Sequence, residues 1–160
     1  MSAALTKPQY RQVIDVYFNK VASKDESLTS LNTAFSKEGA YIYIPKNKMP
    51  KKPVQILHLA TGNEAALLLQ PRNLIIAEEN AELQVIERHQ SLTGNEVLTN
   101  SVTEIFAAKD AIVDYYKVQN DVSTASLIDN TYISLKGKCV VRVRTLSFGG
   151  KVARNSLKIF

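Results

Sequence analysis

The chain is poor in the residues that form cross-links or bind metals. Its 160 residues include one cysteine, Cys139, and two histidines, His58 and His89. A single cysteine excludes an intramolecular disulfide and a zinc site made only of thiolates. A zinc or iron site needs three or four such groups to converge, and these residues fall in separate expected strands, so we expect structural roles for them. The cysteine usage fits a reducing compartment such as the cytoplasm.

Long apolar runs and catalytic signature loops are also absent. No run approaches the roughly 20 apolar residues of a membrane helix, and the first residues contain no basic segment followed by an apolar signal core. The sequence has no Walker-type glycine loop, no G-x-S-x-G and no H-E-x-x-H. We therefore expect no membrane association and no nucleotide hydrolysis by this chain.

The charge is mildly positive, at +5, with basic residues concentrated in the segment PKNKMPKKP, residues 45–53. Lysines in such a loop can contact phosphates, but no aromatic residue there could stack on bases. We expect an exposed connection and no nucleic-acid partner. The proportions of hydrophobic (45%) and charged (22%) residues are those of a folded globular domain.

The first quarter of the sequence has helical periodicity. Thr6 and Gln9 have the spacing of a capping box, and apolar residues at helical spacing predict a helix over residues 7–22. Ser23 and Glu26 predict a second helix, with an apolar face and Gly39 after its end. The apolar stripe of the first helix contains Tyr10, Val13, Ile14, Tyr17, Phe18 and Val21, and that of the second contains Leu28, Leu31 and Phe35.

At Gly39 the pattern changes to that of β-strands. Ala40–Ile44 and a run beginning at Val54 read as strands, and the second is apolar on both faces, which predicts cover on both sides. Residues 65–70 fit a helical turn or a strand equally well. We therefore expect an N-terminal helical segment over residues 1–38 and a β-domain over residues 39–160.

From Asn73 onward a unit of strand, polar turn and strand recurs. Its turn residues Asn80 and Asp110 are 30 positions apart, and Gly137 follows 27 later. A near-fixed interval indicates stacked repeats that cover one another. The periodicity alone leaves open a β-helix, a β-sandwich or an open antiparallel sheet. Aligning the repeats predicts these inward positions: Ala81, Leu83, Val85, Ala111, Val113, Tyr115, Cys139, Val141 and Val143.

Several long phrases of this region resemble the SufB/SufD family of iron–sulfur cluster assembly proteins. They are LNTAFSKEGAYIYIPKN, TGNEAALLLQPRNLII, NAELQVIERHQSL and LTNSVTEIFAAKDAIVDYYKVQN. The resemblance extends from about Leu28 to Phe160. It implies a mainly β fold, a right-handed parallel β-helix (β-solenoid) preceded by two short amphipathic helices, and it implies that the chain is an internal piece of a longer protein.

The resemblance also implies a function. Family members are non-catalytic scaffolds, so we expect a subunit that pairs with SufB and acts with the ATPase SufC, in a complex that handles iron–sulfur clusters. The histidine linked to cluster assembly lies later in the family β-helix, and no residue here matches it. No catalytic, cofactor-binding or metal residue is therefore carried over. Exposed coil edges would allow a homodimer.

An enzymatic alternative rests on the acidic residues of the repeat. Glu87, Glu104 and Asp114 fall in successive strands, and some carbohydrate-active β-solenoids use stacked carboxylates for acid–base chemistry. Basic neighbours such as Arg88 and Lys117 favour ladders of mixed charge on the surface instead. Tyr115 and Tyr116 are adjacent in one strand and should therefore face opposite sides.

Overall fold

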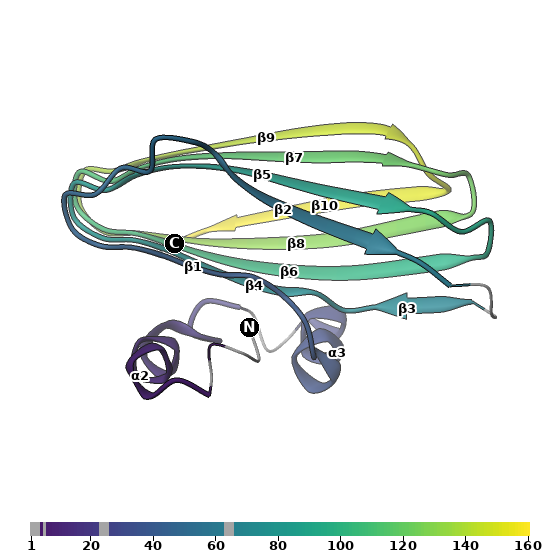
Figure 1. Ribbon diagram of the computed structural model, residues 1–160, viewed down its shortest axis with the longest axis horizontal. Helices are drawn as coiled ribbons and strands as arrows, with labels where there is room; N and C mark the ends of the chain where they lie inside the picture. Colours follow the sequence, from purple (N-terminus) through teal and green to yellow (C-terminus); the bar gives the residue numbers. More distant parts are fainter. Residues whose placement is uncertain (1–3, 5, 23–25, 63–65) are drawn as a thin grey trace.

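The protein is a coil of parallel strands with two helices packed against one side (Figure 1). The computed structural model describes residues 4, 6–22, 26–62 and 66–160. The helices are α2 (Pro8–Tyr17) and α3 (Ser27–Phe35). The strands are β1 (Tyr41–Ile44), β2 (Val54–Ala60), β3 (Leu67–Leu69), β4 (Arg72–Ala77), β5 (Glu82–Ser91), β6 (Val97–Ala107), β7 (Ile112–Asp121), β8 (Ala125–Leu135), β9 (Val140–Gly149) and β10 (Val152–Ile159).

The strands form two sheets between which the chain alternates. The first sheet has the order β1-β4-β6-β8-β10, with β3 also paired to β6, and the second has the order β2-β5-β7-β9. Every pairing in the described strands is parallel. One strand from each sheet makes one coil, and about four coils are stacked. This confirms the β-solenoid and excludes the antiparallel alternatives.

The corners of successive coils lie above one another and use left-handed backbone. Asn80, Asp110 and Gly137 have φ of 56°, 58° and 71°, which confirms the turn positions read from the repeat. Asn47, with φ of 58°, occupies the same corner one coil earlier. Asn80 Nδ2 donates to Asn47 Oδ1 at 3.0 Å, and the Asn47 N–H donates to the Glu79 carbonyl. The basic segment, residues 45–53, contains Asn47 and forms the first corner of the coil. It is exposed, as expected.

The apolar core fills the space between the two sheets near these corners. The predicted inward residues of the first two repeats, from Ala81 to Tyr115, are at most 3% exposed. Cys139, Val141 and Val143 are partly buried against the same cluster. Leu83 pairs with Val113 and Val113 with Val141, so equivalent repeat positions stack directly. The inward positions predicted from the repeat are confirmed.

Helix α2 covers the outer face of the first sheet, where Ile14 packs on Leu74, Ile76 and Phe106. The N-cap residue is Lys7 and not Thr6, so the capping box predicted at Thr6 and Gln9 is wrong. It ends at Tyr17 rather than Ala22. The reason is tertiary: the backbone N–H groups of residues 19, 21 and 22 donate to the Glu104 carboxylate instead of continuing the helix.

Helix α3 turns a polar face to the sheet, contrary to the predicted apolar one. Thr29 and Asn32 are buried, whereas Leu31 is 37% and Phe35 64% exposed. The sheet presents polar groups here, and Asn32 Nδ2 donates to the carbonyls of Pro71 and Asn100. Glu26 caps the helix by accepting from the Thr29 N–H, while Ser23 lies outside the described residues. Ser36 rather than Gly39 follows the last helical residue.

The outer face of the second sheet has no cover among the described residues. Leu57 and Leu59 on β2 are 48% and 45% exposed, so the expectation that both faces of this strand are covered is wrong. The ambiguous stretch 65–70 contains a short strand, β3, rather than a helical turn. Neither described helix is long and apolar enough to span a membrane.

Candidate functional site

A polar cluster occupies the interior of the coil beyond the apolar core. Along β5 the inward positions change from Leu83 and Val85 to Glu87 and His89, all at most 4% exposed. His58 points inward from β2, the edge strand of the same sheet, and pairs in register with His89. Alternation along parallel strands therefore stacks these side chains over one another.

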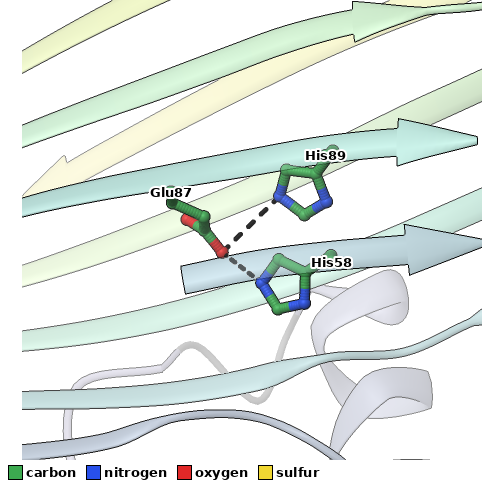
Figure 2. A group of neighbouring side chains, drawn as sticks. All are labelled: His58, Glu87 and His89. Carbon is green, nitrogen blue, oxygen red and sulfur yellow. Dashed lines mark hydrogen bonds and ion pairs between the residues drawn. The ribbon is translucent and has the colours of Figure 1, made fainter. Parts of the chain in front are cut away.

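The Glu87 carboxylate is the centre of this cluster. Its Oε1 atom accepts from His58 Nε2 at 2.8 Å and from Asn73 Nδ2 at 2.7 Å. His89 Nε2 lies 3.5 Å from the same oxygen (Figure 2). The Tyr115 hydroxyl donates to Oε2. Both oxygens of a fully buried carboxylate are thus occupied, as burial of a charge requires.

The charges in this cluster depend on one another. Burial opposes ionisation of Glu87, but the hydrogen bond from His58 and the close contacts with both histidines hold the pKa of Glu87 well below its usual range. Burial opposes charging of His89, and the Glu87 carboxylate outweighs it and raises the pKa of His89. Burial together with the Glu87 charge raises the pKa of Tyr115 well above its usual value. Glu87 is therefore the anion, and the groups around it are donors.

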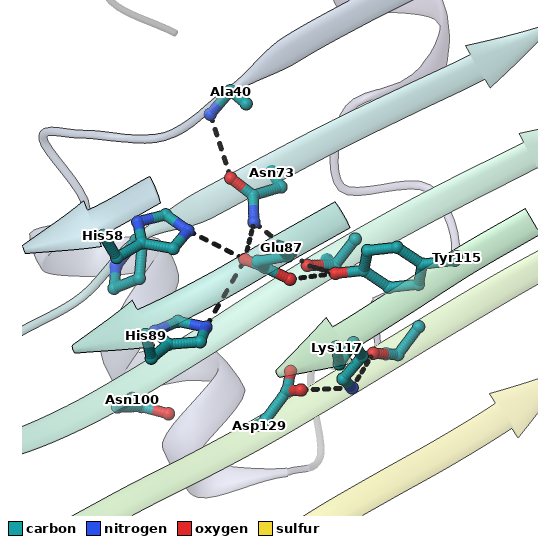
Figure 3. Close-up of polar contacts among 12 residues, drawn as sticks. Ala40, His58, Asn73, Glu87, His89, Asn100, Tyr115, Lys117 and Asp129 are labelled. Carbon is teal, nitrogen blue, oxygen red and sulfur yellow. Dashed lines mark hydrogen bonds and ion pairs between the residues drawn. The ribbon is translucent and has the colours of Figure 1, made fainter. Parts of the chain in front are cut away.

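A second buried pair continues the network into the next coil. Lys117 on β7 forms an ion pair with Asp129 on β8, and its Nζ also donates to Thr131 Oγ1 at 2.8 Å (Figure 3). Burial raises the pKa of Asp129 against the opposing effect of Lys117. A cavity of about 10 Å³ beside His89 is lined by Gln119, Asp129 and neighbours, which is about the space of one water molecule.

The other two acidic residues considered from sequence lie elsewhere. Glu104 is fully buried on the outer face of the first sheet, where it pairs with Arg72 at 2.7 Å. Asp114 lies on the outer face of the second sheet, 3.3 and 3.0 Å from Arg142 and Arg144. The predicted surface ladder of mixed charge is thus found at Asp114, but it is wrong for Glu87 and Glu104, which are buried.

This arrangement does not provide two carboxylates in a cleft. The three acidic side chains point to the interior and to two different outer faces, and glycoside hydrolysis needs a facing pair. A groove of about 420 Å³ between α3 and β3 is lined by a single carboxylate, that of Glu38, in the part of the chain described. Tyr115 is inward and Tyr116 outward, as expected, and Arg144 of the next coil lies 5.1 Å from the Tyr116 ring.

One group in the described residues combines enough potential metal ligands. His58, Glu87 and His89 each offer one atom, and these atoms lie within 4.8 Å of one another. The structure thus brings together two histidines to which sequence reasoning assigned separate structural roles. Their spacing of 31 residues, close to the repeat length, was the available signal, because it places both at one position of successive coils.

Comparison with known families agrees with the coil. Residues 1–56 match the family described as "SufBD protein N-terminal region", and residues 58–160 match "SUF system FeS cluster assembly, SufBD core domain". The chain belongs to the SufBD family. The match to the core domain begins at His58 in β2 and therefore includes His58, Glu87 and His89 of the polar cluster.

Individual relatives give the same assignment. The chain is 26% identical to an iron–sulfur cluster assembly SufBD family protein of Synechocystis, over 93% of this chain and 35% of the relative. It is 28% identical to the iron–sulfur cluster assembly protein SufD of Bacillus subtilis, over 81% of the chain and 29% of that protein. A chloroplastic SufBD family protein of Arabidopsis thaliana is 29% identical over 70% of the chain. The chain thus spans about a third or less of these SufBD proteins.

Proposed function

We propose that the chain is part of a SufD-type scaffold subunit of the SUF iron–sulfur cluster assembly system, which pairs with SufB and acts with the ATPase SufC. Membership of the SufBD family, carried by the match of residues 58–160 to the core domain, is the main support. The similarity to SufD of Bacillus subtilis favours the SufD type.

The placement of the acidic residues supports a scaffold rather than an enzyme. Glu87 and Glu104 are held by hydrogen bonds inside the molecule and are not presented to a substrate. Asp114 is paired with two arginines on the surface. A rigid stack of parallel strands, in which the buried carboxylates of Glu87 and Glu104 are hydrogen-bonded, suits a framework on which other proteins assemble. We place this function in the cytoplasm, because the lone free Cys139 fits a reducing compartment.

We further propose that residues 1–38 form a helical segment and residues 39–160 the β-domain, and that the two act as one framework. The Glu104 carboxylate joins them, because it accepts hydrogen bonds from the backbone of residues 19, 21 and 22. Without its partner, the exposed strands β9 and β10 would allow two copies to associate through their edges.

The test uses the full-length protein, because the chain spans only part of its relatives. The protein would be co-expressed with SufB and SufC homologues, and the complex isolated through a tag on this protein. We expect all three proteins in one peak of defined mass by light scattering. A SufD homologue in place of SufB is the matched control and should not support the complex. If folded SufB and SufC do not associate with this protein, the proposal is wrong.

A further inference from the structure

Two of the three separations among His58, Glu87 and His89 are close to those of metal ligands, and all the potential ligand atoms lie within 4.8 Å of one another. His58 Nε2 and His89 Nε2 lie 2.8 and 3.5 Å from Glu87 Oε1. Ligands bound about 2.0–2.2 Å from one ion are roughly 3.0–3.5 Å apart in octahedral or tetrahedral geometry. Little movement of the β5 and β2 backbones is therefore needed to surround an ion.

The chemistry of the group is also that of a transition-metal site. Two imidazoles and one carboxylate are ligands for Zn²⁺ and Fe²⁺, and this set leaves coordination positions open. An ionised Glu87 inside the coil needs a positive neighbour, which a cation supplies. The hydrogen bond between His58 Nε2 and Glu87 Oε1 holds one proton, and a bound ion would take the place of that proton.

The residues around the group hold the carboxylate in place. Asn73 Nδ2 donates to Oε1 and the Tyr115 hydroxyl to Oε2, while the Ala40 N–H fixes the orientation of the Asn73 amide at 2.9 Å (Figure 3). Hydrogen bonds of this kind to a ligating carboxylate are typical of metal sites.

His89 is one of the buried residues that the network leaves incomplete in the described part of the chain. It is 4% exposed, yet neither ring nitrogen has a hydrogen-bond partner in the described part of the chain. Its Nε2 contact with Glu87, at 3.5 Å, is an ion-pair distance longer than an ordinary hydrogen bond. Buried polar atoms without protein partners are sites at which a water molecule or an ion can bind.

We propose that His58, Glu87 and His89 bind one divalent transition-metal ion, through Nε2 of each histidine and the Glu87 carboxylate. The site is a property of this chain and does not rest on the proposed scaffold function. The two rings are stacked, with centroids 4.5 Å apart and planes 15° apart. The ring nitrogens therefore lie in nearly parallel planes. Binding requires the His58 ring to turn about its soft terminal torsion. Its side chain is 17% exposed on the edge strand, which gives the ion access.

The test uses the chain after treatment with a chelator. Co²⁺ is added while visible absorption is recorded, and Zn²⁺ is added while the histidine ring signals are followed by NMR. The chain contains two histidines, so both sets of ring signals can be assigned without ambiguity. We expect one equivalent of metal to bind and both rings to shift together at the same metal concentration.

Variants identify the ligands. His58→Ala and Glu87→Gln should weaken Co²⁺ binding at least about 100-fold, because removing a ligand costs more than removing a supporting hydrogen bond. Cys139→Ser, at the apolar end of the coil, and Asp114→Asn, on the outer face, should bind like the unaltered chain. Circular dichroism checks that each variant is folded. If Glu87→Gln does not fold, the shifts of the two histidine ring signals in the unaltered chain decide whether both histidines bind the ion.

Two results would overturn the proposal. One is that millimolar Zn²⁺ leaves either histidine ring unperturbed. The other is that folded His58→Ala binds Co²⁺ as tightly as the unaltered chain, which would place the ion elsewhere.

Discussion

Arg72 and Glu104 form an ion pair of 2.7 Å in which both side chains are completely buried. The two residues lie on neighbouring strands β4 and β6, on the face of the first sheet that the helical segment covers. Glu104 also accepts hydrogen bonds from the backbone of Asn19, Val21 and Ala22. One carboxylate thus neutralises a buried guanidinium and ends the first helix.

Removing this carboxylate should destabilise the protein strongly. Glu104→Ala leaves Arg72 buried without its counter-ion and leaves three backbone N–H groups without their acceptor. We expect the free energy of unfolding to fall by about 3–5 kcal/mol, measured by urea denaturation. The matched control is Asp114→Ala, because Asp114 pairs with two arginines that are 47% and 48% exposed. That change should cost about 0–1 kcal/mol. Equal losses for the two variants would contradict the central position of Glu104.

Gly39 is required by close backbone approach. It has φ of +144°, and a Cβ added there would lie 1.8 Å from the Arg72 carbonyl oxygen. Gly39→Ala should therefore cost at least about 1–3 kcal/mol from backbone strain, with the clash adding to this. Gly94→Ala is the control, since an added Cβ there has no described atom within 4 Å. Thermal unfolding followed by circular dichroism should show a large fall in Tm for the first variant only.

The orientation of α3 can be tested on two of its residues. Asn32→Ala removes both hydrogen bonds from Asn32 to the buried carbonyls of Pro71 and Asn100 and should cost about 1–3 kcal/mol. Phe35→Ala truncates a side chain that is 64% exposed and should change stability by no more than about 0.5 kcal/mol. Denaturant titrations of both variants give the comparison. A larger loss for Phe35→Ala would mean that the helix buries its apolar face after all.

The exposed pair at the first corner should be visible in a pH titration. The hydrogen bond and the charge of Lys46, 2.8 Å away, lower the pKa of Glu79 below 4.5. A lowered pKa in the folded state contributes stability above the unfolded pKa and loses it as pH falls through the folded pKa. Carboxyl ¹³C NMR should report this shift, and Lys46→Met should raise the pKa of Glu79 toward its usual value, because Lys46 is the main cause of the lowering. An unchanged value in Lys46→Met would assign the shift to another group.

Much of the fold follows from local pattern because a β-solenoid repeats one local solution. Asn80, Asp110 and Gly137 mark corners since each tolerates left-handed backbone. The inward positions Leu83, Val113 and Val141 follow from strand alternation once the repeat is aligned. The periodicity left the topology open, and the family resemblance favoured the parallel coil that the structure confirms.

Other features were mispredicted where distant residues compete with local preference. The periodicity of the first helix continues to residue 21, but the backbone donors after Tyr17 bind Glu104, more than 80 residues away. Helix α3 has the predicted apolar stripe, but its polar face packs on the sheet, because polar groups of the sheet accept hydrogen bonds from Asn32.

The sequence by itself determined the stacked β-repeat, its corner residues, its apolar core and, through its phrases, the family. These depend on interactions between neighbouring or regularly spaced residues. Only the tertiary structure decided that Glu87 lies inside the coil, Glu104 under the helices and Asp114 at the surface. It also placed His58 over His89 beside Glu87. Strand alternation indicates the face on which a polar residue lies, but the partners that it meets there depend on what packs from other coils and from the helices, and that packing has no local signal in the sequence.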